Sequence, residues 1–188
     1  MNTANKLTVL RIIMVPFFMF FMMIALSPET TSTGYVTAAL VLFVAASLTD
    51  TLDGYIARHY NMITNFGKLM DPLADKMLTT AAFLGLMSCG RASAWAVLLI
   101  LTREFIVAGI RQVAAGGGKV IAASVWGKMK TVFQMVAIVA AIILLYPFCP
   151  EPTGTLITNI LVWLSAVVTV ISGADYVIKN ISVFKDAK

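Results

Sequence analysis

A long apolar stretch of the chain ends in two acids: residues Tyr35–Ala57 read YVTAALVLFVAASLTDTLDGYIA. An α-helix rises 1.5 Å per residue, so about 20 apolar residues cross the roughly 30 Å hydrocarbon core of a bilayer. Asp50 and Asp53 stand near the end of the stretch. A spacing of three residues puts both on one face of a helix. The stretch therefore predicts a membrane-spanning helix with an acidic end.

Five more apolar stretches of similar length accompany this one, separated by clusters of Pro, Gly and polar residues. They are Leu7–Leu26, Pro72–Cys89, Ala92–Val113, Gly127–Tyr146 and Thr155–Ile178. Of the 188 residues 60% are hydrophobic and 12% charged, whereas soluble domains carry about 45–50% and about 25%. The alternating ten-residue segments of a membrane β-barrel are absent. We therefore predict an all-α integral membrane bundle of six transmembrane helices, forming a single domain over residues 1–188.

The basic residues predict the orientation of this bundle. Of the 14 lysines and arginines, only Arg91 falls on the side opposite the two termini. Because cytoplasmic segments of membrane proteins carry the excess of Lys and Arg, we expect both termini in the cytoplasm and the protein in the cell (inner) membrane. Topology thus accounts for the net charge of +5, and no nucleic-acid partner is expected. Most acidic residues map to the same half, which predicts a polar cleft facing the cytoplasm.

A second acidic pair, Asp71 and Asp75, follows in the next stretch at a spacing of four residues. A short connection favours antiparallel neighbouring helices, so four carboxylates can converge on one cleft. Hard oxygen ligands suit Mg²⁺, Mn²⁺ or Ca²⁺, and a pair of such ions is a common clamp for phosphoryl-type displacement. A lone acidic pair at a helix end is usually a cap or a solvated face. Four acids interleaved with two glycines, an alanine and an arginine at fixed spacing favour a site.

The run from Asp50 to Asp75 reads D-x-x-D-G-x-x-A-R-x₈-G-x-x-x-D-x-x-x-D. It resembles the signature of the CDP-alcohol phosphatidyltransferase family, without a substitution. Asn5–Arg11 (NKLTVLR) is similar to the family's N-x-L-T-x-x-R. Asp71–Lys76, Thr102–Glu104 and Trp126–Thr131 are similar to the bacterial members that make phosphatidylglycerophosphate. These matches span roughly residues 5–135, whereas the last fifty or so residues match only in hydropathy.

The resemblance implies transfer of a phosphatidyl group from CDP-diacylglycerol to sn-glycerol 3-phosphate, with release of CMP. It also implies two divalent cations, Mg²⁺ or Mn²⁺, and a homodimer in the lipid bilayer. The implied metal ligands are Asp50, Asp53, Asp71 and Asp75. Asp75 is also the implied general base. The implied CDP-binding residues are Thr8, Arg11, Asp50, Gly54, Ala57, Arg58 and Gly67.

Glycerol 3-phosphate is itself an anion, so its binding requires a second basic group. The basic residues at the cytoplasmic parts of the fourth and fifth stretches are Arg103, Arg111, Lys128 and Lys130. We expect them to bind the acceptor phosphate, and positive-inside topology is the alternative interpretation of basic residues on this side. Glu104 either orients its neighbour Arg103 or simply pairs with it.

Two alternatives to this function remain open. The first keeps the chemistry and changes the acceptor to inositol phosphate, serine or phosphatidylglycerol, although a basic pocket favours a phosphorylated acceptor over serine. The second is a cation channel or transporter, because intramembrane acids often mark ion paths. Charge confined to one half of the membrane disfavours a path, which needs polar groups on both sides.

Overall fold

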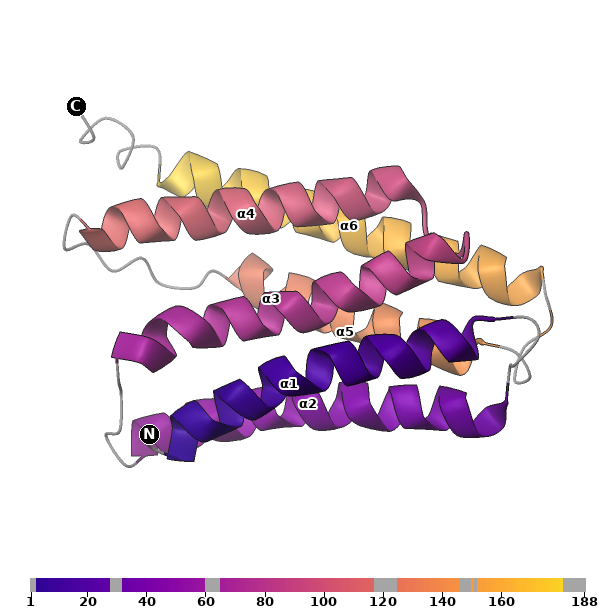
Figure 1. Ribbon diagram of the computed structural model, residues 1–188. Helices are drawn as coiled ribbons and strands as arrows, with labels where there is room; N and C mark the ends of the chain where they lie inside the picture. Colours follow the sequence, from indigo (N-terminus) through magenta and orange to yellow (C-terminus); the bar gives the residue numbers. More distant parts are fainter. Residues whose placement is uncertain are drawn as a thin grey trace.

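The computed structural model describes residues 3–27, 32–59, 65–116, 125–145, 150 and 152–180, apart from the side chains of 3–4, 50–69, 71–72 and 115–116. The described residues form six α-helices and no strand. The helices are α1 (Thr3–Ala25), α2 (Thr33–His59), α3 (Asn65–Ser88), α4 (Ala94–Gly116), α5 (Val125–Ile143) and α6 (Thr153–Lys179). They form one elongated bundle in which α1 begins and α6 ends at the same end (Figure 1). The predicted all-α class is confirmed.

Most helices begin and end within a few residues of the predicted stretches, and α3 is the exception. It begins at Asn65, well before the predicted start at Pro72, and so includes Gly67. Hydropathy detects the apolar part of a helix alone, whereas the polar segment Asn65–Asp71 continues the same helix outside that part. The start predicted at Pro72 was therefore seven residues too late.

The surface of the bundle suits a membrane. Among the described residues, three helices are long and apolar enough to cross a bilayer by composition: Asn5–Ala25, Val125–Ile143 and Thr153–Lys179. The described apolar segment of α2 is shorter, and α3 and α4 carry several charged residues. Large apolar side chains lie outward all along the bundle, with Phe105 68% exposed. Apolar surface of this extent indicates a membrane protein, because it is costly in water and favourable in hydrocarbon.

The apolar core is centred on the first three helices. Phe18 of α1 and Phe43 of α2 are fully buried, with ring centroids 5.6 Å apart and planes tilted by 48°. Phe83 of α3 is buried in the same cluster. Small residues bring these backbones together: a Cβ at Gly85 of α3 would lie 2.9 Å from the Met22 sulfur of α1. This close packing sets the position of α3, which carries Asp71 and Asp75.

The last three helices meet through polar groups as well as apolar ones. Helix α6 packs against both α5 and α4. Its buried face includes Thr169, whose hydroxyl accepts a hydrogen bond of 3.1 Å from the Gln134 side chain of α5. Hydrogen bonds between side chains are a common means of helix association inside a membrane. The second half of the bundle is thus held partly by specific polar contacts.

Candidate active site

The signature acids lie on two helices that contact each other. Asp50 and Asp53 stand nine and six residues before the end of α2 at His59, and Asp71 and Asp75 are four residues apart on α3. The end of α2 and the beginning of α3 are at the same end of the bundle (Figure 1). The backbone therefore places both acidic pairs in one region, as the spacing predicted.

Most of the predicted metal and nucleotide ligands lie outside the described side chains. These residues are Asp50, Asp53, Gly54, Ala57, Arg58, Gly67 and Asp71. Among the described side chains, no three His, Cys, Asp or Glu residues come together as a metal site. Asp75 is the one signature acid whose side chain is described, and it is half-buried on α3.

Thr8 and Arg11 of α1 are described and both are buried, Arg11 completely. The Arg11 Nε donates a hydrogen bond of 3.2 Å to the backbone carbonyl of Ala46 in α2. Ala46 precedes Asp50 by one helical turn. A buried cation on α1 therefore reaches α2 directly beside the beginning of the signature.

Next to Asp75 on α3, Lys76 connects the signature helix to α4. Its ammonium donates a hydrogen bond of 3.2 Å to the backbone carbonyl of Glu104. Lys76 thus links the acidic end of α3 to Glu104 of α4, which in turn contacts Lys130 of α5.

Glu104 lies at the centre of these basic residues. One of its carboxylate oxygens, Oε1, accepts hydrogen bonds from Lys130 Nζ of α5 and from Arg103 Nη1, the latter at 3.3 Å. The side chains of Glu104 and Lys130 are each 12% exposed, and that of Arg103 is 8% exposed. The structure therefore brings Arg103 and Lys130, two of the four proposed phosphate-binding residues, together through a shared carboxylate.

Arg103 also extends from α4 to α6. Its Nη2 donates a hydrogen bond of 2.8 Å to the Ser172 hydroxyl, while its buried Nε has no partner among the described residues. The side chain of Arg103 passes α6 at Gly173, where an added Cβ would lie 2.6 Å from Arg103 Cγ. Glycine is required here by close approach, since any larger residue would displace the arginine.

The other two predicted phosphate residues are more open to solvent. Arg111 is exposed, and its Nε donates a hydrogen bond of 3.3 Å to the hydroxyl of buried Tyr176 on α6, with the guanidinium 5.5 Å from the ring centroid. Lys128 is also exposed. It precedes Lys130 by two residues, which is about 200° around a helix, so the two lysines point to different sides of α5.

Four contributors were missed by sequence reasoning. Lys76 directly follows Asp75 in the signature segment, so the sequence could have pointed to it. Tyr176, Ser172 and Gly173 lie in the part of α6 that resembles the family only in hydropathy. Nothing local distinguishes these α6 residues from ordinary small or aromatic residues of a membrane helix. Their roles depend on contacts with α4 more than 60 residues away in sequence.

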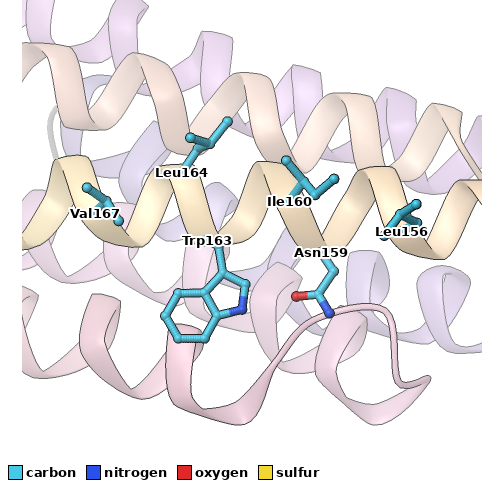
Figure 2. A pocket seen from close by; sticks show the side chains of 6 residues that line it. All are labelled: Leu156, Asn159, Ile160, Trp163, Leu164 and Val167. Atoms are coloured by element: carbon cyan, nitrogen blue, oxygen red, sulfur yellow. The ribbon is translucent and has the colours of Figure 1, made fainter.

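A shallow apolar pocket of about 360 Å³ lies on α6 (Figure 2). It is lined by Leu156, Asn159, Ile160, Trp163, Leu164 and Val167. Trp163 and Asn159 point to the same side of the helix. No titratable group lines the pocket, so it has none of the chemistry of the charged cluster around Glu104.

Known proteins match this chain over most of its length. The model of the CDP-alcohol phosphatidyltransferase family matches residues 1–171. A Bacillus subtilis protein named CDP-diacylglycerol–glycerol-3-phosphate 3-phosphatidyltransferase is 40% identical over 186 residues, which is 95% of each chain. A probable phosphatidylglycerophosphate synthase of Mycobacterium tuberculosis is 39% identical over 178 residues, covering 94% of this chain and 80% of the relative.

A solved structure has the same fold. It is the crystal structure of Mycobacterium tuberculosis phosphatidylinositol phosphate synthase in its apo form, with a TM-score of 0.61. The superposition covers 94% of this chain and 87% of that one, at 20% sequence identity. At this identity the similarity supports the arrangement of the helices and says nothing about the acceptor.

Proposed function

The chain belongs to the CDP-alcohol phosphatidyltransferase family, and from this membership we propose that it transfers a phosphatidyl group from CDP-diacylglycerol to sn-glycerol 3-phosphate. The products are phosphatidylglycerophosphate and CMP. The name of the Bacillus subtilis relative, which matches nearly end to end, specifies glycerol 3-phosphate and supports this acceptor. The reaction breaks the bond between the β-phosphorus and the CMP oxygen and forms a bond from that phosphorus to the acceptor hydroxyl.

The residues present fit a pair of divalent cations, which we propose to be Mg²⁺ or Mn²⁺. The helical spacing puts Asp50 with Asp53, and Asp71 with Asp75, on shared faces of two contacting helices. All four donors are carboxylates, the ligand type that hard cations prefer. When bound, such ions neutralise the pyrophosphate and stabilise the departing phosphate oxygen.

This chain's own residues supply the remaining steps. Asp75 accepts the proton of the acceptor hydroxyl as the phosphorus–oxygen bond forms, because an alcohol is a poor nucleophile until a base takes its proton. Gly54, Ala57 and Gly67 leave room for the nucleotide against the helix backbones, and Arg58 binds the pyrophosphate by charge-assisted hydrogen bonds. Thr8 and Arg11 support this side from α1, where the Arg11 side chain contacts α2 one turn before Asp50.

The cluster of described cations around Glu104 is the observation that supports a phosphorylated acceptor. Among the described side chains, Lys76, Arg103 and Lys130 gather around Glu104, with the exposed Arg111 on the same helix, and the described carboxylates there are Glu104 and Asp75. A low-dielectric site with more cations than anions favours an anionic ligand. The phosphate of glycerol 3-phosphate supplies that charge. We propose that Arg103 and Lys130 bind it at the Glu104 cluster, and that the exposed Arg111 and Lys128 reach it with their long side chains from the solvent side.

We further propose that the protein works as a homodimer of single-domain subunits in the cell (inner) membrane, with both termini in the cytoplasm. The distribution of Lys and Arg supports this orientation. The charged cluster then faces the compartment that holds glycerol 3-phosphate, while the acyl chains of CDP-diacylglycerol remain in the bilayer.

An acceptor panel tests this function. Purified protein in detergent or liposomes receives CDP-diacylglycerol labelled in its phosphatidyl group, Mg²⁺ and one acceptor: glycerol 3-phosphate, inositol phosphate, serine or phosphatidylglycerol. We expect CMP release and a labelled phosphatidylglycerophosphate product with glycerol 3-phosphate. Turnover with another acceptor alone would contradict the assigned acceptor, and absence of CMP release with every acceptor would contradict the reaction itself.

A further inference from the structure

We propose that Glu104 is a positioning residue that holds Lys130 and Arg103 in place for the acceptor phosphate. The inference rests on the proposed function, since it assigns a role in binding the same acceptor. It concerns an acid whose sequence context left two interpretations open, orientation of Arg103 or simple pairing.

The geometry favours orientation over simple pairing. Both cations donate to the same oxygen, Oε1 of Glu104, although they come from different helices. The backbone carbonyl of Glu104 accepts a third hydrogen bond, from Lys76 of α3. Arg103 is held from its other side by Ser172 of α6. This one turn of α4 therefore connects α3, α5 and α6 by polar contacts.

Lys130 and Arg103 are largely buried, so the positions of their charged ends affect how well the acceptor binds. Lys and Arg have many rotamers, and the shared carboxylate restricts both side chains before the acceptor arrives. Preorganised donors bind an anion better than mobile ones, because the cost of ordering them is not taken from the binding energy. Glu104 would raise acceptor affinity through geometry even though it carries the wrong charge to attract a phosphate.

The negative charge of Glu104 allows two roles to be told apart by experiment: positioning of the cations and simple charge balance. By Coulomb's law alone, removing a negative charge next to a phosphate site tightens phosphate binding. If Glu104 merely offsets excess positive charge, Glu104→Gln lowers the KM for glycerol 3-phosphate. If Glu104 positions the cations, the same change raises that KM, because Lys130 and Arg103 lose their common anchor.

The experiment measures both Michaelis constants of purified wild type, Glu104→Gln and Glu104→Asp at saturating Mg²⁺. For Glu104→Gln we expect the KM for glycerol 3-phosphate to rise about tenfold or more, the equivalent of one charge-assisted hydrogen bond, with the KM for CDP-diacylglycerol unchanged. Glu104→Asp keeps the charge and shortens the arm by one methylene, so positioning predicts a rise here too. An unchanged or lowered acceptor KM in both variants would overturn the inference.

A double-mutant cycle tests whether Glu104 acts through Lys130. In a Lys130→Met background, Glu104→Gln should add much less to the acceptor KM than it does in wild type, since its main partner is already gone. Fully additive effects would show that Glu104 acts independently of Lys130 and would overturn the proposed route. The Lys130→Met background also keeps the test informative if Glu104→Gln alone folds poorly, because its buried cation is then absent.

Asp175→Asn is the matched control. Asp175 is also an acid of the same half, in a 2.7 Å ion pair with Lys179, a residue that is 62% exposed. It should leave both Michaelis constants unchanged. The wild-type arm separates the two proposals: if wild type uses another phosphorylated acceptor, the assigned acceptor fails and the Glu104 test continues with that acceptor. Use of an unphosphorylated acceptor alone would overturn the inference about Glu104.

Discussion

The two halves of the proposed site are encoded differently. The nucleotide side lies on α2 and α3, where the acids, glycines and arginine follow one another within Asp50–Asp75. The acceptor side joins residues of α3, α4, α5 and α6 that are far apart in sequence; Arg103 and Ser172, for example, are in contact 69 residues apart. A linear signature identifies the first half, whereas contacts between distant helices build the second. The halves should therefore respond differently to substitution.

The largest effect is expected from removing the metals or their ligands. EDTA should abolish CMP release, and added Mg²⁺ or Mn²⁺ should restore it, because the four proposed ligands are all carboxylates. Asp50→Ala, Asp53→Ala and Asp71→Ala should each remove nearly all turnover in the same assay. Full activity of a chelated, metal-free preparation would contradict the two-cation proposal.

The next effect concerns the base. Asp75→Asn keeps the shape and one coordinating oxygen but cannot accept a proton, so kcat should fall by about 10²–10⁴-fold, the usual contribution of a general base. A greater loss would indicate that the residue also holds a metal. A nearly normal kcat in this variant would assign the base to another group.

On the acceptor side the effects should be smaller and confined to one substrate. Arg111→Ala and Lys128→Ala each remove a charge-assisted donor, so the KM for glycerol 3-phosphate should rise about 10–150-fold while the KM for CDP-diacylglycerol stays fixed. Arg58→Ala should show the reverse pattern, because it stands on the nucleotide side. Loss of affinity for CDP-diacylglycerol alone in the two basic variants would mean that the phosphate pocket is misassigned.

The fold was predictable because it depends on local pattern, and the nucleotide side stays a prediction made from the same kind of pattern. Hydropathy located six helices, and a spacing of three or four residues is enough to say that two acids share a helix face. The early start of α3 at Asn65 was not predictable by hydropathy, since the added segment is polar. Tyr176 and Ser172 were not predictable either, because their importance comes from the α4 residues opposite them.

The smallest and most specific effect is expected at Gly173, which lies in the segment that resembles the family only in hydropathy. A methyl group there would lie 2.6 Å from Arg103 Cγ, so Gly173→Ala must displace the arginine and weaken its contact with Ser172. Overpacking of this kind typically costs about 1–3 kcal/mol. We expect a lower Tm and a several-fold higher KM for glycerol 3-phosphate. Gly109→Ala on α4 is the control, because a Cβ there meets no atom of the described part of the chain within 4 Å. It should leave both Michaelis constants unchanged. Equal behaviour of the two alanine variants would mean that the position of Arg103 does not matter for the acceptor, and that the contact between α4 and α6 is packing alone.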